Sequence, residues 1–333
     1  MRVNLELSFI RPIDFVTESS RLTLFHFSTG NFRAHSSAGG DRLLLAPGFC
    51  YALVAFMSVC DKLIVSLLFL LASSVPASSE PLTAPGRLKS SPALTVTDAG
   101  TWKTVYKGMA FRQIGLERSE PKHSIDLKLV RFDTQSLFPR ILRSVQFGFK
   151  GANAKTFVEK SGAVAAINAS YFDTDGKPLA FLKIAGQMIN SRVSTSPLYT
   201  GTFGVKDQRP LIWHRDEFLP DQAEEALQCG PLLLLHGIPQ AVTGVPNRAN
   251  RRTLIGIDHE QRLVVAVTDT VLGGLHWYEL QELLSASTWQ VQLTDLLNLD
   301  GGGSAQLYVK SGNFEAMVPG TAEVPVAIGI FYR

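Results

Sequence analysis

The sequence predicts an α+β fold with a mixed β-sheet core and a few helices packed on it. Short stretches that alternate apolar and polar residues outnumber helical patterns, and such alternation is typical of strands. Strand and helix patterns follow each other in mixed order, without internal repeats or heptads. The chain has 333 residues, of which 45% are hydrophobic, and this is enough apolar material for one sizeable core.

Individual elements follow from the same patterns. One helix is expected at 154–160, where Gly162 closes its C-terminal side, and another at 275–286, where leucines recur near helical spacing. The polar residues from Asp258 to Gln261, between two apolar runs, predict a β-hairpin. Strands are expected at 102–116, 124–132, 163–167, 181–189, 202–213, 232–235, 253–257, 263–268, 293–299, 306–309 and 324–331.

An apolar run from Leu63 to Ala72 predicts a secretory signal. The run is too short to cross a bilayer, which takes about 20 residues, but it has the length of a signal's hydrophobic region. Met57 precedes it, and a small-x-small cleavage pattern ending at Ala77 follows it. We therefore expect a signal peptide at 57–77, preceded at 1–56 by a non-native upstream extension.

The rest of the chain is expected to form a linker followed by one domain. Residues 78–100 are rich in Ser, Pro, Thr and Ala, as linkers are, and the domain would span 101–333. The mature protein would be secreted or periplasmic, without a stable membrane span. One alternative stays open, because residues 43–60 are also apolar. Met1 would then be the true start, and a membrane hairpin would lie near the N-terminus.

Composition and missing motifs argue against several classes of function. A net charge of +3 without a concentrated basic patch argues against a nucleic-acid partner. The three cysteines form no CxxC pair and no HxH or HExxH motif occurs, so we expect neither a zinc site nor a disulfide framework. No GxSxG nucleophile elbow is present, and Cys229 is interpreted as a small buried residue.

The segment Asn298-Leu299-Asp300-Gly301-Gly302-Gly303-Ser304 carries the clearest chemical signal. Asn298 and Asp300 would share one face of a strand, because side chains alternate along it. Three successive glycines allow a turn whose amides converge as an anion-binding nest. An acid, an amide and a nest together suit a phosphate ester or a developing oxyanion. The alternative is a flexible glycine loop between strands.

Other segments supply further candidate site residues. Asn168 ends a buried strand, where it would hydrogen-bond substrate or fix a turn, and Tyr171 would form a sugar-stacking wall or part of the core. Arg252 is the last of three arginines before a strand. Guanidinium groups bind phosphate bidentately, although a solvated basic loop is the alternative. Asp269 follows an apolar strand and is expected at the sheet edge beside the site.

Taken in order, four segments resemble the phosphodiester glycosidase family. Its members carry an Ala-x-x-Ala-Ile-Asn-Gly-Gly-Phe-Phe block, a Gly-Gly-Pro-Leu-Leu block, an Arg-Thr-Ala-Ile-Gly block and Asn-Leu-Asp-Gly-Gly-Gly-Ser. The corresponding segments here are 163–172, 229–233, 252–256 and 298–304. The last block is intact, whereas Ala169-Ser170 replaces a glycine pair, Tyr171 replaces Phe and Cys229 replaces a Gly. The resemblance covers residues 102–333 and implies a single domain of that family's fold.

The resemblance implies hydrolysis of a sugar-1-phosphodiester at the anomeric carbon, with a phosphorylated sugar or glycan as substrate. The leaving group is then a phosphate monoester with a pKa of about 6, which needs charge stabilisation more than protonation. Arg252 and the amides of Gly301, Gly302 and Gly303 would supply that stabilisation, and Ser304 would bind substrate beside them.

Asp300 is the first choice for the carboxylate that activates water or attacks carbon, and Asp269 is the second. Asn168 and Asn298 would orient the sugar or the phosphate, with Tyr171 beside them. We expect no cofactor. A divalent cation held by Asp300 and a substrate phosphate is compatible with this chemistry, but no sequence feature demands one.

Three other functions stay open. A non-catalytic envelope protein that binds phosphorylated glycans would share the fold without turnover, and the altered Ala169-Ser170 pair is compatible with it. A membrane-tethered scaffold would use residues 43–72. An ordinary glycosidase would need a dedicated acid with a raised pKa and would not need Arg252.

Overall fold

The computed structural model describes residues 86–333. The expected upstream extension and signal peptide lie outside these residues, as does the first part of the expected linker. No helix in the described part is long and apolar enough to cross a membrane.

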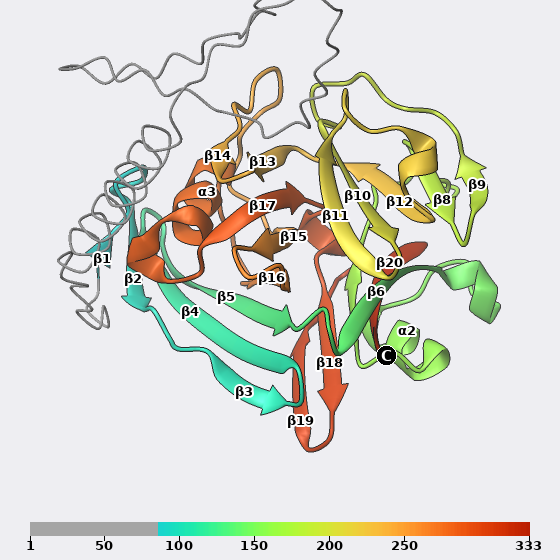
Figure 1. The fold of residues 1–333 in the computed structure, drawn as a ribbon. Coiled ribbons are helices and arrows are strands. Elements are labelled where there is room, and N and C mark those ends of the chain that lie inside the picture. Colours follow the sequence, from blue (N-terminus) through green and yellow to red (C-terminus); the bar gives the residue numbers. More distant parts are fainter. Residues whose placement is uncertain (1–85) are drawn as a thin grey trace, which may run out of the picture. The chain divides into compact units, whose positions relative to one another are not determined.

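The largest of three sheets has the strand order β1-β2-β4-β5-β16-β15-β17-β13-β14, with β3 also paired to β4 (Figure 1). Its middle strands β15 and β17 are apolar along most of their length, as expected for strands covered on both faces. The strands are β1 (Gly86–Arg87), β2 (Leu94–Asp98), β3 (Lys103–Tyr106), β4 (Met109–Ser119), β5 (Lys122–Phe132), β13 (Leu232–Leu235), β14 (Ile238–Pro239), β15 (Thr253–Asp258), β16 (Leu263–Asp269) and β17 (Leu293–Asn298).

Two five-stranded sheets complete the β structure, with the orders β11-β10-β12-β8-β9 and β19-β18-β7-β20-β6. The first contains β8 (Leu182–Ile184), β9 (Gln187–Asn190), β10 (Gly201–Lys206), β11 (Arg209–His214) and β12 (Glu225–Cys229). The second contains β6 (Leu137–Arg143), β7 (Ala165–Asn168), β18 (Leu307–Ser311), β19 (Phe314–Val318) and β20 (Val326–Tyr332).

Two α-helices lie among the described residues. Helix α2 (Ala154–Ser161) begins at Asn153, whose side chain accepts a hydrogen bond from the Thr156 amide, and it ends at Gly162 in the left-handed conformation. Helix α3 (Trp277–Ser285) buries its apolar side, including Leu280 and Leu284. Short 3-10 turns are η1 (Ser144–Phe147), η2 (Pro220–Gln222), η3 (Ser287–Trp289) and η4 (Gly302–Ser304).

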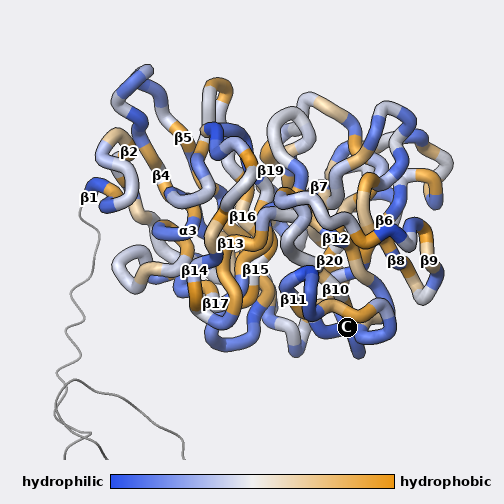
Figure 2. The backbone as a smooth tube through the Cα atoms, turned by 90° about the horizontal axis from the view of Figure 1, so that it is seen from above, coloured by the Kyte–Doolittle hydropathy of each residue, from blue (hydrophilic) through white to orange (hydrophobic). Residues whose placement is uncertain are grey.

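Two large apolar clusters hold these layers together. The first joins all three sheets through residues such as Val265, Phe203 and Ile328, and the second packs α3 against the other face of the largest sheet. Hydrophobic residues accordingly follow the middle strands β13, β15, β16 and β17, and hydrophilic residues gather at loops (Figure 2). Burial of this apolar surface is the main stabilising contribution to the fold.

The α+β expectation fits only roughly, because the described chain is mostly β structure. All strand pairs are antiparallel, so the expected mixed sheet is wrong. Tight turns join several of the neighbouring strands, such as β4 and β5 or β15 and β16, and an antiparallel pair allows such turns whereas a parallel pair needs a long crossover connection.

Other differences concern element boundaries. The expected linker at 78–100 is wrong over its described part, because β2 pairs with β4 and buries Leu94 and Val96. The expected strands at 102–116, 181–189 and 202–213 are each two strands joined by a turn. One of these turns uses Asp207 and Gln208, both at positive φ, and it contains no glycine that would have marked it. Strands β6, β12, β14 and β19 were not expected.

Candidate active site

The turn that follows β17 meets two other predicted segments. The Leu299 amide donates to the Thr253 carbonyl (2.8 Å), which continues the β15–β17 pairing by one residue. The Asp300 amide donates to the Ala169 carbonyl (3.0 Å), just after β7. Because Leu254 pairs with Asn298, extension of this register brings Arg252 opposite Asp300. The turn, the segment after β7 and the start of β15 are therefore contiguous.

Asn168 joins these three segments through its side chain. Its Nδ2 donates to the Asp300 carbonyl (2.7 Å), while its Oδ1 accepts from Thr253 Oγ1 (2.7 Å) and from the Gln306 amide (3.1 Å). The side chain is fully buried. Of the two roles considered for Asn168, the structure supports fixing a turn, and it leaves no free polar atom there to orient a sugar or phosphate.

Asp300 is partly exposed, and no cation or second carboxylate of residues 86–333 affects the pKa of its carboxyl. Burial raises its pKa to about 6, against the opposing effect of hydrogen bonds from the Ser304 side chain and the Gly301 amide. The Gly301 amide is 2.8 Å from Oδ1. A carboxyl with a pKa near neutrality suits proton transfer, since catalytic acids and bases work best close to the ambient pH.

Two tyrosines and a cysteine surround Asp300. Tyr171 donates to the Gly230 carbonyl (2.9 Å), and its ring contacts that of Tyr199 edge-on at 5.4 Å. Burial, together with the nearby Cys229 and Asp300, raises the pKa of Tyr171 well above its usual value and that of Tyr199 to about 12. Both phenols are therefore neutral near pH 7. Tyr171 is better described as a wall of the site than as a base.

Cys229 is fully buried, as expected from the sequence. Burial raises the pKa of its thiol, although the amides of Gly230, Tyr171 and Asp300 lie close enough to oppose that effect. The neutral thiol has no role as a nucleophile in this state.

Asn298 is also fully buried at the end of β17. Its Nδ2 donates to the carbonyls of Gly230 (2.8 Å) and Leu299 (2.7 Å), whereas its Oδ1 has no hydrogen-bond partner among the described residues. The donor half of the amide thus serves the fold, and only the acceptor half is available to another group.

The glycine turn does not form the expected anion nest. The Gly301 amide binds the Asp300 carboxylate, and the Gly302 amide donates to the Arg251 carbonyl (2.9 Å). Glycine is nevertheless needed here, because a Cβ on Gly301 would lie 2.6 Å from the Arg251 carbonyl oxygen and Gly302 has φ +60°. At Gly303, a Cβ would lie 2.7 Å from Thr321 Oγ1. Close packing, rather than amide convergence, accounts for these glycines.

Arg252 is buried against the Trp277 ring, with its guanidinium carbon 4.6 Å from the ring centroid. Its Nε donates to the Leu275 carbonyl (3.2 Å) and its Nη2 to the Arg248 carbonyl. Burial lowers its pKa to about 10, so the group stays cationic at neutral pH. Nη1 makes no hydrogen bond to another residue of 86–333. The fold therefore holds a desolvated positive charge on the first residue before β15, and neither Arg252 nor Asp300 affects the pKa of the other.

Asp269 ends β16 at the same end of the sheet as the turn, because β16 and β17 both pair antiparallel with β15. Its carboxylate forms an ion pair with Lys128 Nζ at 2.8 Å. No hydrogen bond or ion pair connects it to Asp300 within the described chain. The structure thus places Asp269 at that end of the sheet, in an ion pair with Lys128 that the sequence did not indicate.

Sequence reasoning missed Tyr199 as a neighbour of the site, and it missed Arg192 as a neighbour of Tyr199. Tyr199 contacts Tyr171, and Arg192 lies close enough to oppose the rise in the pKa of Tyr199. Both residues lie in an irregular segment between β9 and β10, where no periodic pattern or motif marks them. Among residues 86–333, no group of three or more His, Cys, Asp or Glu side chains could hold a metal ion.

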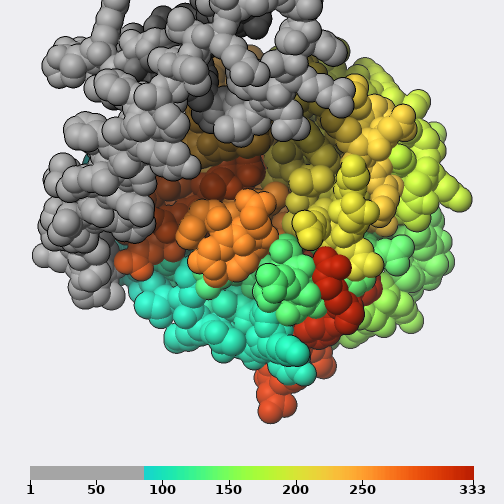
Figure 3. Space-filling view, in the orientation of Figure 1, coloured from blue at the N-terminus to red at the C-terminus, as the bar shows by residue number. Residues whose placement is uncertain are grey.

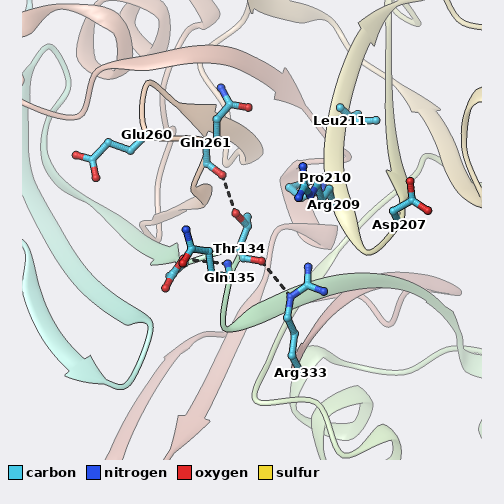
Figure 4. A pocket seen from close by; sticks show the side chains of 10 residues that line it. Thr134, Gln135, Asp207, Arg209, Pro210, Leu211, Glu260, Gln261 and Arg333 are labelled. Carbon is cyan, nitrogen blue, oxygen red and sulfur yellow. Dashed lines mark hydrogen bonds between the residues drawn. The ribbon is translucent and has the colours of Figure 1, made fainter.

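A cavity of about 830 Å³ lies at the other end of β15 (Figure 4). The turns near residues 134, 209 and 260 surround it with Arg333, and these segments lie side by side in the space-filling view (Figure 3). The six residues of β15 separate this cavity from Asp300 by roughly 20 Å. None of the predicted site residues lines it.

Two solved structures share the fold of this chain. A hypothetical protein from Synechocystis has 16% identity and a TM-score of 0.51, with 72% of this chain and 65% of that chain covered. The catalytic domain of zebrafish N-acetylglucosamine-1-phosphodiester alpha-N-acetylglucosaminidase, auto-inhibited by its pro-peptide, has 16% identity and a TM-score of 0.53. Here 71% of this chain and 87% of that chain are covered. This chain thus spans slightly less than two thirds of the Synechocystis protein.

No curated protein matches the sequence. Residues 161–331, just over half of the chain, match the family model of the phosphodiester glycosidases. The matched region contains the Asp300 turn, Asn168 and Arg252, which the structure brings together. This chain belongs to the phosphodiester glycosidase family.

Proposed function

We propose that this protein hydrolyses the bond between the anomeric carbon and the phosphate of a sugar-1-phosphodiester within a phosphorylated glycan. One observation carries the proposal. The intact Asn-Leu-Asp-Gly-Gly-Gly-Ser turn presents Asp300, a carboxyl whose pKa burial raises to about 6, and the extended β15–β17 register brings the backbone of Arg252, a residue with a desolvated guanidinium, opposite it. Such a pair suits reaction at a carbon that is bonded to a phosphate.

A single carboxyl group is sufficient for this reaction. An ordinary glycosidase pairs a general acid with a second carboxylate, because an alkoxide leaving group needs a proton. A departing phosphate monoester has a pKa of about 6 and leaves without one. No second carboxylate contributes to the pKa of Asp300, and Asp269 is paired with Lys128. This charge distribution favours a phosphodiester over a sugar–sugar bond.

In the proposed reaction, ionised Asp300 acts on the face of the sugar opposite the phosphate. It either removes a proton from water, which attacks the anomeric carbon, or attacks that carbon itself, in which case water then hydrolyses the glycosyl–Asp300 ester and releases the sugar. The C–O bond to phosphate breaks with its electron pair on the phosphate oxygen. Arg252 stabilises the charge that develops there, because its guanidinium already lies in a water-poor environment.

The site of action that we propose is the periplasm or the cell exterior. This rests on the signal peptide expected at 57–77, which lies outside the described residues. N-terminal sequencing of the mature protein, expressed in its host, gives Ser78 as first residue if the proposal is right. An intact N-terminus before Met57 would contradict it.

The reaction is tested with a sugar-1-(methyl phosphate) and the matching methyl glycoside, in water enriched in ¹⁸O. We expect release of free sugar and methyl phosphate from the first substrate only, with ¹⁸O in the sugar. Label in the phosphate would show cleavage of the P–O bond and would contradict the mechanism. Binding of the phosphodiester without turnover by the folded protein would favour the glycan-binding alternative.

A further inference from the structure

A second cavity, of about 390 Å³, has a basic lining. Arg143, Lys177 and Arg192 contribute three positive charges, and Asp173 contributes one negative charge. The volume falls in the range of small-molecule sites.

Much of this positive charge is uncompensated by the protein. Neither Arg143 nor Arg192 forms an ion pair with another residue of 86–333. Lys177 is 3.6 Å from Asp175 in a highly exposed pair, which contributes little. The Asp173 carboxylate accepts hydrogen bonds from the amides of Asp175 and Lys177, both at 2.9 Å. It therefore stabilises the turn at 173–177 and forms no ion pair with the basic residues of the cavity.

Two side chains, those of Asn190 and Gln228, hold the backbone around Arg192 in place. Asn190 accepts from the Arg192 amide (2.9 Å) and donates to the Pro178 carbonyl (2.7 Å). Gln228, fully buried, accepts from the Ser194 amide (2.7 Å) and donates to its carbonyl (2.8 Å). The backbone that carries Arg192 is therefore fixed, even though the Arg192 side chain is exposed.

This cavity lies close to the candidate active site. Arg143 pairs with Val326 across β6 and β20, and the Val326 carbonyl accepts from the Ala169 amide (3.1 Å). Two strand spacings, roughly 10 Å, thus separate the backbone of Arg143 from that of Ala169. The Ala169 carbonyl in turn binds the Asp300 amide.

A second connection runs through the loop after β7. The Leu179 amide, at the cavity, donates to the carbonyl of Tyr171, at the site (3.1 Å). On the same side, Arg192 lies near the Tyr199 phenol, which contacts Tyr171.

We propose that the cavity lined by Arg143, Lys177 and Arg192 binds a second anionic group of the substrate, beyond the phosphodiester that is cleaved. This inference rests on the proposed function and narrows it to polyanionic glycans. Arginine side chains bind phosphate and carboxylate groups in a fork geometry, and an uncompensated basic cavity favours either anion over a neutral group.

Three substrates test whether the second anion lies on the aglycone or on the sugar. One is the neutral-aglycone reference, a sugar-1-(methyl phosphate). The second carries a phosphate monoester at the far end of a glycerol aglycone. The third carries a carboxylate on the sugar and keeps the methyl aglycone. The full-length chain is compared with the double variant Arg143→Gln/Arg192→Gln, and with Arg209→Gln as a control, because Arg209 is an exposed arginine of the other cavity.

For wild type we expect a higher kcat/KM on one of the two doubly anionic substrates than on the reference. The double variant should lose roughly ten-fold of kcat/KM on that substrate, through KM, since two partly exposed charge pairs are removed and each contributes modestly to binding. Its activity on the reference should stay within about two-fold. Unchanged discrimination in the double variant, or an equal loss in Arg209→Gln, overturns the proposal.

Binding of inorganic pyrophosphate, measured by calorimetry, gives a readout that needs no turnover. We expect roughly ten-fold weaker binding in the double variant and unchanged binding in Arg209→Gln. If wild type cleaves none of the three substrates, the proposed function fails, and this measurement alone decides whether the cavity binds anions. Equal pyrophosphate binding by all three proteins would show that it does not.

Discussion

Asp300 and Asp269 lie at the same end of one sheet, on or just beyond strands that flank β15, yet their surroundings differ. Asp269 forms an ion pair with Lys128 at 2.8 Å. Asp300 has hydrogen bonds from Ser304 and Gly301 but no cationic partner that affects its pKa, and burial raises that pKa to about 6. Position in the sheet brought both carboxyls to one edge, but the neighbouring side chains determine which of them remains available for chemistry.

The difference has a physical basis. A carboxylate beside a lysine is stabilised in its charged form, and that charge is already neutralised by its partner. A carboxyl that loses hydration without gaining a cation holds its proton up to higher pH, and it becomes a better base when it loses that proton. We therefore propose that Asp300 alone carries the reaction.

The largest effect should come from Asp300→Asn. We expect kcat on a sugar-1-(methyl phosphate) to fall by about 10³-fold, because the amide can neither accept a proton from water nor attack carbon. Release of free sugar, measured over time, checks this. Circular dichroism should show an unchanged fold, and a variant that retains more than a tenth of wild-type activity would remove Asp300 from the mechanism.

The second largest effect concerns Asn168, whose side chain holds the backbone of Asp300. Asn168→Ala should lower the free energy of unfolding by about 3 kcal/mol, because it leaves buried groups of Asp300, Thr253 and Gln306 without partners. Urea unfolding measures the change. Asn190→Ala is the control, because its side chain is half-buried and donates one hydrogen bond, to Pro178, while accepting another from the Arg192 amide. A loss no larger than in the control would show that Asn168 does not anchor the turn.

The sequence predicted the central strands well, and it also predicted that the Asp300 turn, the end of β7 and the start of β15 lie together. Both successes have identifiable reasons. The β15–β16 hairpin has long apolar runs around a polar turn, and the Asn-Leu-Asp-Gly-Gly-Gly-Ser block is intact. Periodicity could not reveal strand β12, which is buried along its whole length and interrupted by Glu225 and Gln228. Nor could it show that β2 pairs with β4, since its composition resembles a linker.

The roles within the site were harder to predict than its location. An asparagine at a strand end is compatible both with substrate binding and with a structural hydrogen bond, and only the partners of Asn168 decide between them. In the same way, three glycines allow a nest, but the Arg251 carbonyl already occupies the Gly302 amide. The pairing of Asp269 with Lys128 depends on β5 and β16 being neighbours, which residue spacing does not encode.

A third test sharpens the contrast through the pH dependence of stability. The folded pKa of Asp300, about 6, exceeds the ordinary value of 3.8, so ionisation costs more in the folded state than in the unfolded state. Its contribution to stability is fully present below pH 3.8 and is lost as the pH rises through 6. Asp300→Asn does not titrate, so its unfolding free energy relative to wild type should rise by about 2 kcal/mol between pH 4 and pH 8.

Urea unfolding of both proteins at the two pH values gives this difference directly. A constant difference between variant and wild type would mean that Asp300 ionises as freely in the folded protein as in the unfolded chain. Its surroundings would then be no different, electrostatically, from those of an exposed carboxylate.

The smallest effect should come from Asp269→Asn. The ion pair with Lys128 joins side chains that are 33% and 18% exposed, and such pairs contribute less than about 1 kcal/mol to stability. Activity on the sugar-1-(methyl phosphate) should stay within about two-fold of wild type, because Lys128 already neutralises the carboxylate that is removed. Lys128→Gln and the double variant complete a cycle that isolates the pair. A hundred-fold loss of kcat in Asp269→Asn alone would mean that both carboxylates take part in the reaction. The low pKa of the phosphate leaving group would then not be the reason why one carboxyl suffices.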